Sequence, residues 1–360
     1  MSVITYKCPN CGGELIFDPG SGQYKCEYCM SKFSEEEVRS ANPEAEGEEQ
    51  SADEDTKERE STAEKGNAEK TGAVIYTCPS CGAEIITDET TAATFCFYCH
   101  NPVILTGRLS GEYLPDRVIP FAIDRKQAVE KFLTYVKKKK FIPRDFFDKE
   151  QLKKMTGVYF PYWIYGGTFD ASYRAKGRKI RIWRAGDMEY TETSVYDVRR
   201  EGTVEVGGLS RNALKKADKD LMECVLPYKP DGIKEFSMGY LSGFQAEKRD
   251  IERKDVEEEL RAERDTMVQN ALKNEAEGYS SMEAEQTSVR TIVDRWQYVL
   301  CPVWTLTYPG KNGKIYYYAM NGQTGKINGD FPVDGKKAAI TSVISGLLVM
   351  VLMMVGGYFL

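Results

Sequence analysis

The sequence predicts a multidomain chain: two small cysteine-rich β modules, a β-rich α+β domain with a long charged helix, and a C-terminal transmembrane helix. Three observations support this fold class. A cysteine pattern repeats after 70 residues, alternating apolar runs fill the middle, and the last 23 residues carry no charge. The expected boundaries are 1–33 and 73–106 for the two modules, 34–72 for a linker, 107–335 for the β-rich domain and 338–360 for the membrane helix.

Eight of the ten cysteines fall into two matching sets. Each set has the spacing C-x2-C-x14-C-x2-C, and neighbouring residues such as Gly12 and Gly82 also match. The simplest interpretation is a duplicated module. The candidate metal ligands are Cys8, Cys11, Cys26 and Cys29 in the first module and Cys78, Cys81, Cys96 and Cys99 in the second.

This spacing indicates a zinc ribbon in each module. Two cysteines separated by two residues can share one tight turn, and two such turns close a tetrahedral four-sulfur site, which favours Zn²⁺. A module of this size buries too little surface to fold alone, so metal should supply much of its folding free energy. Two zinc ions are therefore expected. Iron in a rubredoxin-like site and a thioredoxin-like redox pair are the alternatives, and His100, next to Cys99, could replace that cysteine as a ligand.

Residues 34–72 are expected to form a disordered acidic linker. This stretch lacks aromatic residues, and its acidic residues outnumber its basic ones. Such a composition cannot offset the entropy of ordering by burying apolar surface. A solvated spacer is the plain interpretation, and an acidic docking segment for a basic partner is the functional one.

The middle of the chain alternates apolar and polar residues, which is typical of strands. We expect the run from 157 to 183 to form strands broken by glycine, and a charged helix over 244–273. The blocks Pro161–Trp163 and Pro302–Trp304 suggest a weaker internal repeat with two related halves. Cys224 and Cys301 lie in apolar surroundings, so we expect buried, unreactive thiols.

The final segment, 338–360, predicts a single membrane-spanning helix. At about 1.5 Å per residue, its 23 uncharged residues reach roughly 34 Å, enough for a hydrocarbon core of about 30 Å. Lys336 and Lys337 precede it, so the positive-inside rule predicts a cell-membrane, single-pass protein whose soluble part is cytoplasmic. The alternative is a buried C-terminal core helix.

Several function classes are disfavoured. The net charge of −6 argues against a strongly basic nucleic-acid-binding surface. The chain has no phosphate-binding loop, and its one histidine, His100, adjoins a predicted ligand, so serine–histidine or cysteine–histidine catalysis lacks a natural base. We therefore expect no enzyme activity and assign no catalytic or cofactor-binding residue.

Several segments together resemble a bacterial family. They are the paired CPxCG and CxYC motifs, ETTAATFCFYCHNPVIL, VIPF, YFPYW, and PVWTLTY with NGQTGKINGD. The chain resembles the TFIIB-type zinc-ribbon-containing proteins over most of its length, the linker excepted. For members with a C-terminal membrane segment, the resemblance implies work at the cytoplasmic membrane in envelope stress, with phage-shock-protein-A-like and SPFH/flotillin-like partners. The family name describes ribbon shape and implies no role in transcription.

Three functional hypotheses follow. The first is a membrane-anchored zinc-ribbon adaptor or scaffold that recruits protein partners. The second is nucleic-acid binding by the ribbons, which would require clustered lysine and arginine and would weaken steeply with salt. The third is a membrane enzyme or protease adaptor whose chemistry leaves no recognisable motif.

Overall fold

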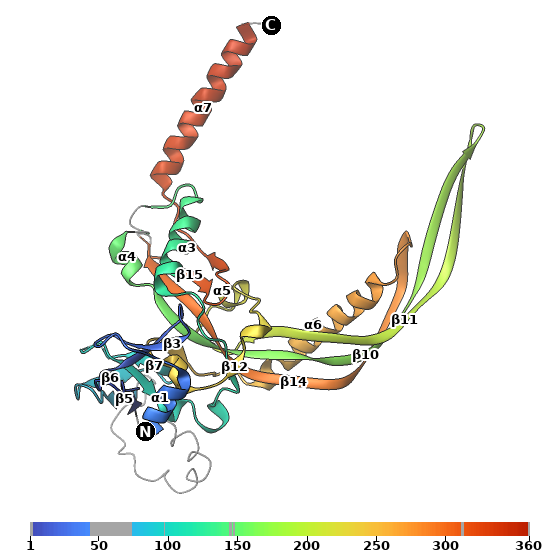
Figure 1. Ribbon diagram of the computed structural model, residues 1–360. Coiled ribbons are helices and arrows are strands. Elements are labelled where there is room, and N and C mark those ends of the chain that lie inside the picture. Colours follow the sequence, from blue (N-terminus) through green and yellow to red (C-terminus); the bar gives the residue numbers. More distant parts are fainter. Residues whose placement is uncertain are drawn as a thin grey trace.

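The computed structural model describes residues 3–43, 74–96, 98–143, 146, 148–310 and 313–358. Most of the expected linker, residues 44–72, therefore lies outside the described residues. The chain forms a β-rich body with the ribbons on one side (Figure 1). A long β arm and a C-terminal helix project from the body in different directions (Figure 1).

The first ribbon is a three-stranded antiparallel sheet followed by a short helix. The sheet has the order β2-β3-β4, and helix α1 begins where the linker was expected to begin. Ser34 and Glu37 form a capping box at the start of α1, so the first turn has partners for its free amides. The elements are β1 (Val3–Ile4), β2 (Leu15–Asp18), β3 (Gln23–Cys26), β4 (Lys32–Phe33) and α1 (Glu35–Ala41).

The second ribbon is built into the body. Its first hairpin, β5 (Val74–Thr77) with β6 (Glu84–Thr87), is a separate two-stranded sheet. Its second hairpin, β7 (Thr91–Phe95) with β8 (Pro102–Leu105), belongs to the main sheet. There β8 also pairs with β1 of the first ribbon. The two copies of the repeat therefore have different surroundings.

The main sheet has 11 strands, in the order β1-β8-β7-β13-β10-β14-β15-β16. Off this path, β11 pairs with β10, and β9 pairs with β12 and β14. The blocks around Trp163 and Trp304 lie on the neighbouring antiparallel strands β10 and β14. The remaining strands are β9 (Arg117–Val118), β10 (Thr156–Ala185), β11 (Met188–Asn212), β12 (Lys234–Glu235), β13 (Gln245–Glu247), β14 (Ser281–Pro309), β15 (Ile315–Asn321) and β16 (Ile327–Gly329).

Helices cover parts of this sheet. Helix α3 begins after Asp124, whose carboxylate accepts a hydrogen bond from the Gln127 amide, as an N-cap does. The helices are α3 (Arg125–Lys137), α4 (Lys149–Lys153), α5 (Lys219–Cys224), α6 (Arg253–Asn274) and α7 (Gly335–Tyr358). The short 3-10 turns are η1 (Thr106–Arg108), η2 (Gly111–Tyr113), η4 (Pro230–Gly232) and η5 (Met238–Leu241).

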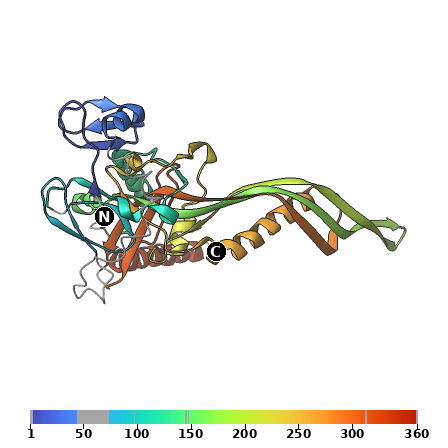
Figure 2. The same ribbon diagram turned by 90° about the horizontal axis from the view of Figure 1, so that it is seen from below.

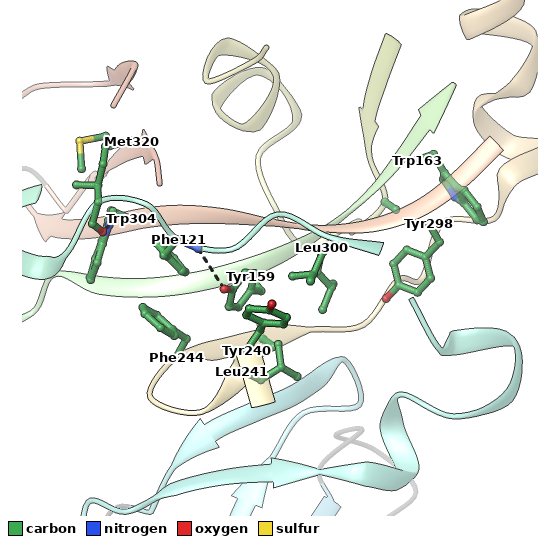
Figure 3. Packing of buried hydrophobic residues seen from close by; sticks show 14 of the residues in the cluster. Phe121, Tyr159, Trp163, Tyr240, Leu241, Phe244, Tyr298, Leu300, Trp304 and Met320 are labelled. Carbon is green, nitrogen blue, oxygen red and sulfur yellow. Dashed lines mark hydrogen bonds between the residues drawn. The ribbon is translucent and has the colours of Figure 1, made fainter. Parts of the chain in front are cut away.

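An aromatic core holds the body together. Figure 3 shows Phe121, Phe244 and Trp304 gathered around Tyr159. The Phe121 and Phe244 rings stack with centroids 4.3 Å apart. The Phe121 amide donates to the Tyr159 hydroxyl, which satisfies this fully buried oxygen. The Tyr240 ring packs edge-on against Phe17, 5.2 Å between centroids, so the core continues into the first ribbon.

The arm consists of the distal halves of β10, β11 and β14, with α6 along one face (Figures 1 and 2). Buried apolar residues of α6, such as Leu260 and Val268, belong to the same core cluster as Tyr165 and Phe169 of β10. Arg264 of α6 donates to the Tyr165 hydroxyl. The helix thus supplies the apolar cover that a long sheet arm needs on one face.

The transmembrane prediction for 338–360 is wrong. Crossing a bilayer needs about 20 consecutive apolar helical residues. Across the residues whose placement the structure describes, no helix combines that length with that apolarity. The fold class with a membrane helix and the single-pass localisation are corrected accordingly. Helix α7 leaves the body, and its described apolar side chains, such as Leu347 and Met353, are exposed.

Candidate metal centres

The first cysteine set forms one compact cluster in the first ribbon. The ligand atoms of Cys8, Cys11, Cys26 and Cys29 all lie within 4.8 Å of one another. The Cys8–Cys29 and Cys11–Cys26 sulfur pairs are each 3.6 Å apart. Cys8 and Cys26 are buried and their partners exposed, so the cluster lies at the edge of the ribbon.

The second set repeats this arrangement 70 residues later. Cys78, Cys81, Cys96 and Cys99 also lie within 4.8 Å of one another. The Cys78–Cys99 and Cys81–Cys96 sulfur pairs are each 3.7 Å apart. The sequence-predicted residues are therefore brought together in both modules. Exposed His100 belongs to neither cluster of ligand atoms.

These distances fit a tetrahedral metal. Four sulfurs about 2.3 Å from Zn²⁺ would lie roughly 3.7–3.8 Å from one another. The observed separations of 3.6 and 3.7 Å agree with this value. None of the eight cysteines forms a disulfide. The two zinc-ribbon-like clusters could hold two metal ions, which is consistent with zinc.

The backbone turns explain the spacing. In each ribbon the glycine after the second cysteine has a positive φ, +70° at Gly12 and +72° at Gly82. Each glycine amide donates to the carbonyl of the first cysteine in its pair. At the second turn, Met30 and His100 occupy the same left-handed conformation, with φ of 61° and 60°. His100 therefore occupies a turn position. Glycine adopts this left-handed conformation with the least strain, as Gly12 and Gly82 do at the first turn of each ribbon.

Neighbouring groups shift thiol ionisation in opposite directions. The Ser31 hydroxyl, 3.3 Å from the Cys29 sulfur, and the Ser31 amide lower the pKa of Cys29 to about 6. Burial, together with hydrogen bonds to the neighbouring thiols, raises the pKa of Cys99 to about 12. Zinc binds thiolates, so loading the second cluster must displace protons from its thiols.

A buried glutamate joins the two ribbons. Glu14 Oε1 accepts hydrogen bonds from Ser80 Oγ at 2.6 Å and Asn101 Nδ2 at 2.5 Å. Ser80 directly precedes the ligand Cys81, and Asn101 follows the ligand Cys99 by two residues. Lys7 Nζ is 3.4 Å from the same oxygen. Sequence reasoning missed this role: Glu84 occupies the equivalent position in the repeat but is exposed, so no local signal separates the two.

A second ionic contact ties the second ribbon to the body. Lys216 Nζ lies 2.7 Å from Asp88 and 2.8 Å from Glu247. Thr90 Oγ1 lies within hydrogen-bond distance of both carboxylates, 3.0 Å from Asp88 and 2.8 Å from Glu247, and can donate its one hydrogen to either. Burial raises the pKa of Glu247, and the lysine works against that effect. The cation is therefore shared by a ribbon carboxylate and a body carboxylate.

The other two cysteines are separate from the metal clusters. Cys301 is fully buried, and burial raises the pKa of its thiol well above the usual value. Cys224, at the end of α5, is exposed, so the prediction that it is buried is wrong. Its position at the C-terminal end of a short helix leaves one side open to solvent.

Comparison with known proteins places the chain in a family. No family model matches the sequence, and no solved structure matches it. The chain is 31% identical over 362 residues to a protein of Bacillus subtilis (strain 168) described as "Uncharacterized protein YdjG". The similarity covers 99% of this chain and 100% of that protein. At this identity over its full length, the chain belongs to the same family as YdjG of Bacillus subtilis.

Proposed function

We propose that the chain is a metal-stabilised adaptor whose ribbons form a rigid platform for protein partners. In each cluster, four thiolates would complete the coordination of a tetrahedral zinc ion, which is typical of structural sites. We accordingly assign zinc the role of ordering the ribbons and propose no catalytic step.

One observation carries this proposal: the two ribbons use the same face differently. In the first ribbon, Ile16 packs on Gly243 of the body, where an added Cβ would be only 3.0 Å from Ile16. The Phe17 amide also donates to the Ser242 carbonyl. In the second ribbon the equivalent residue, Ile86, has 61% of its surface exposed. A face that binds a protein segment in one copy is therefore open in the other.

The open face is apolar and pre-shaped. Ile75 of β5 and Ile86 of β6 lie directly opposite each other in the register, and each is 61% exposed. Paired exposed isoleucines on a rigid hairpin can bury apolar area on association at low entropic cost. We propose that this pair, the ribbon face, contacts an apolar segment of a partner.

The resemblance to the ribbon family supplies the partner candidates for the envelope-stress role: phage-shock-protein-A-like and SPFH/flotillin-like proteins. The test compares the wild-type chain with a variant that carries both Ile75→Asp and Ile86→Asp, each used to pull down the purified candidate partners. We expect the variant to capture at least tenfold less partner than the wild type, while its metal content stays at two ions per chain. Ile315→Asp, on β15 and 49% exposed, is the matched control and should leave capture unchanged.

Two results would contradict the adaptor proposal. One is equal capture by the wild-type chain and the doubly substituted chain. The other is absence of protein capture together with tight, salt-sensitive binding of nucleic acid, which would favour the ribbon–nucleic-acid alternative.

A further inference from the structure

The outer edge of β11 is the longest strand edge without a partner in the described part of the chain. β11 pairs with β10 alone, and its register is unbroken from Met188 to Val206. Proteins usually protect such an edge with proline, with charged side chains, above all lysine, or with a bulge. Between 188 and 206 there is no proline and no lysine, and the nearest bulge lies beyond Val206. The charged residues of this stretch are of both signs, five Asp or Glu and two Arg, so a second strand can meet them with opposite charges.

The backbone groups on this edge point outward at odd-numbered residues. The Ser280 amide donates to the Arg178 carbonyl, so even-numbered residues of this part of β10 direct their backbone groups away from β11. Odd-numbered residues of β10 therefore bond to β11, and Lys179 is paired with Ser194. It follows that even-numbered residues of β11 bond to β10, and odd-numbered ones such as Val195 face outward.

Three apolar side chains beside the edge are exposed rather than covered. Ile180, Ile182 and Val195 are 49%, 60% and 56% exposed, and alternation places them on one face of the hairpin. Helix α6 ends at Asn274, where Arg200 of β11 donates to the Glu275 carbonyl. The distal half of the arm, to which these residues belong, therefore extends past the end of its covering helix (Figure 1).

We propose that a second copy of this chain covers this edge, by antiparallel pairing of β11 with β11 around a two-fold axis at Val198. The product would be a continuous six-stranded sheet, β14-β10-β11 joined to β11-β10-β14 of the other copy. Such an isologous contact uses the same residues on both copies and closes on itself. This inference is independent of the proposed function.

Length and charge choose the centre of this pairing. With the two-fold axis at Val198, Met188 at the hairpin end of one copy lies opposite Gly208 of the other. At Gly208 β11 leaves its regular course, with a φ of +75°, so the paired length ends at both limits of the regular strand. Asp197 then lies opposite Arg199 of the other copy, twice across the axis. A centre one residue earlier would oppose two Asp197 side chains, and like charges directly opposite each other destabilise a sheet.

The free chain leaves these charges available. Arg199 is exposed, and the Lys176–Asp197 pair, at 3.3 Å, has both side chains more than half exposed. Exposed pairs of this kind are worth little in the monomer. Reorganising Asp197 toward Arg199 of a second copy therefore costs little.

The experiment measures the mass of the full chain by sedimentation, with non-ionic detergent present because α7 exposes apolar side chains. We expect a dimer for the wild type. Val195→Pro removes an outward amide without touching the β10 ladder, and should give a monomer with two bound metal ions and an unchanged circular dichroism spectrum. Val195→Thr keeps the amide and should remain dimeric.

A charge exchange tests the register. Asp197→Arg and Arg199→Asp should each raise the dissociation constant about tenfold, because two attractive pairs become repulsive. The doubly substituted chain should recover the wild-type value. A wild-type chain that is monomeric at every concentration, a dimer that survives Val195→Pro, or a double variant as weak as the single ones would each overturn the proposal.

Discussion

Replacing Glu14 by alanine should loosen the first ribbon from the second without releasing metal. Glu14 accepts short hydrogen bonds from Ser80 and Asn101 and a longer one from Lys7. Bonds to a charged acceptor contribute about 1.5–3 kcal/mol each, and the half-exposed lysine adds at most about 1 kcal/mol. After the cost of burying the carboxylate, we expect a loss of about 2–4 kcal/mol.

The Phe17 amide provides the measurement. It donates to the Ser242 carbonyl at 3.0 Å, across the boundary between ribbon and body. Its hydrogen exchange therefore reports undocking of the first ribbon, as local opening does elsewhere. A loss of about 2–4 kcal/mol corresponds to exchange roughly 30 to 1,000 times faster. Glu14→Gln keeps an acceptor oxygen and should cost only about 1 kcal/mol.

Metal analysis completes this test. Neither Glu14 variant changes a cysteine, so both should retain two metal ions per chain. If Glu14→Ala accelerates exchange of the Phe17 amide less than about threefold, or loses metal in parallel, then Glu14 does not couple the two ribbons.

Three further outcomes are expected. Cys8→Ser and Cys78→Ser should each reduce metal from two ions to one by elemental analysis, since the clusters share no ligand; loss of both ions from either variant would contradict separate sites. Lys216→Met leaves the largely buried Glu247, whose pKa burial raises, without its cation. When the folded-state pKa of a carboxyl lies above its unfolded value, the protein loses stability as pH rises from the unfolded pKa through the folded one. Urea denaturation should therefore show this variant's deficit growing as pH rises above the ordinary pKa of a glutamate, by roughly 1–2 kcal/mol. Gly167→Ala places a Cβ 2.0 Å from the Val293 carbonyl oxygen and should cost about 2–4 kcal/mol in thermal unfolding, whereas Gly202→Ala, with nothing within 4 Å, should be nearly neutral.

The metal clusters could be predicted because the residues that shape each C-x2-C turn are close together in the sequence. A C-x2-C pair fixes its own turn, and Gly12 or Gly82 supplies the positive φ that the turn requires. The closing of each cluster then needs only two such turns on neighbouring hairpins. This is why eight residues chosen by spacing alone all lie in the expected groups.

The continuous strands of the arm could not be predicted, because the role of the glycines in β10 depends on residues far away in the sequence. The sequence indicated strands broken by glycine near 166 and 167, yet β10 runs through both without ending. An added Cβ at Gly166 would be 2.7 Å from the Val206 carbonyl oxygen, and at Gly167 it would strike the Val293 oxygen. These glycines admit neighbouring strands at close approach, a property that depends on residues about 40 and 126 positions away.

The roles of repeated residues also depend on context. Glu14 and Glu84 match in the repeat, as do Ile16 and Ile86, yet only the first of each pair is covered. The reason is that the first ribbon packs as a separate unit on the body, whereas the second gives its β7–β8 hairpin to the main sheet. Sequence identity between the copies cannot report which copy packs its isoleucine face, Ile16 or Ile86, against the body.

This difference bears on how a duplicated ribbon can acquire a binding role. Joining the main sheet fixes the second ribbon through backbone pairing of β7 and β8, so its first hairpin need not pack on the body to be held. The first ribbon has no such sheet continuation beyond the short β1 and must use its Ile16 face and Glu14 for docking. The face of the second ribbon that carries Ile75 and Ile86 thus stays exposed while β7 and β8 hold the ribbon in the main sheet, which is the condition that the proposed adaptor surface requires.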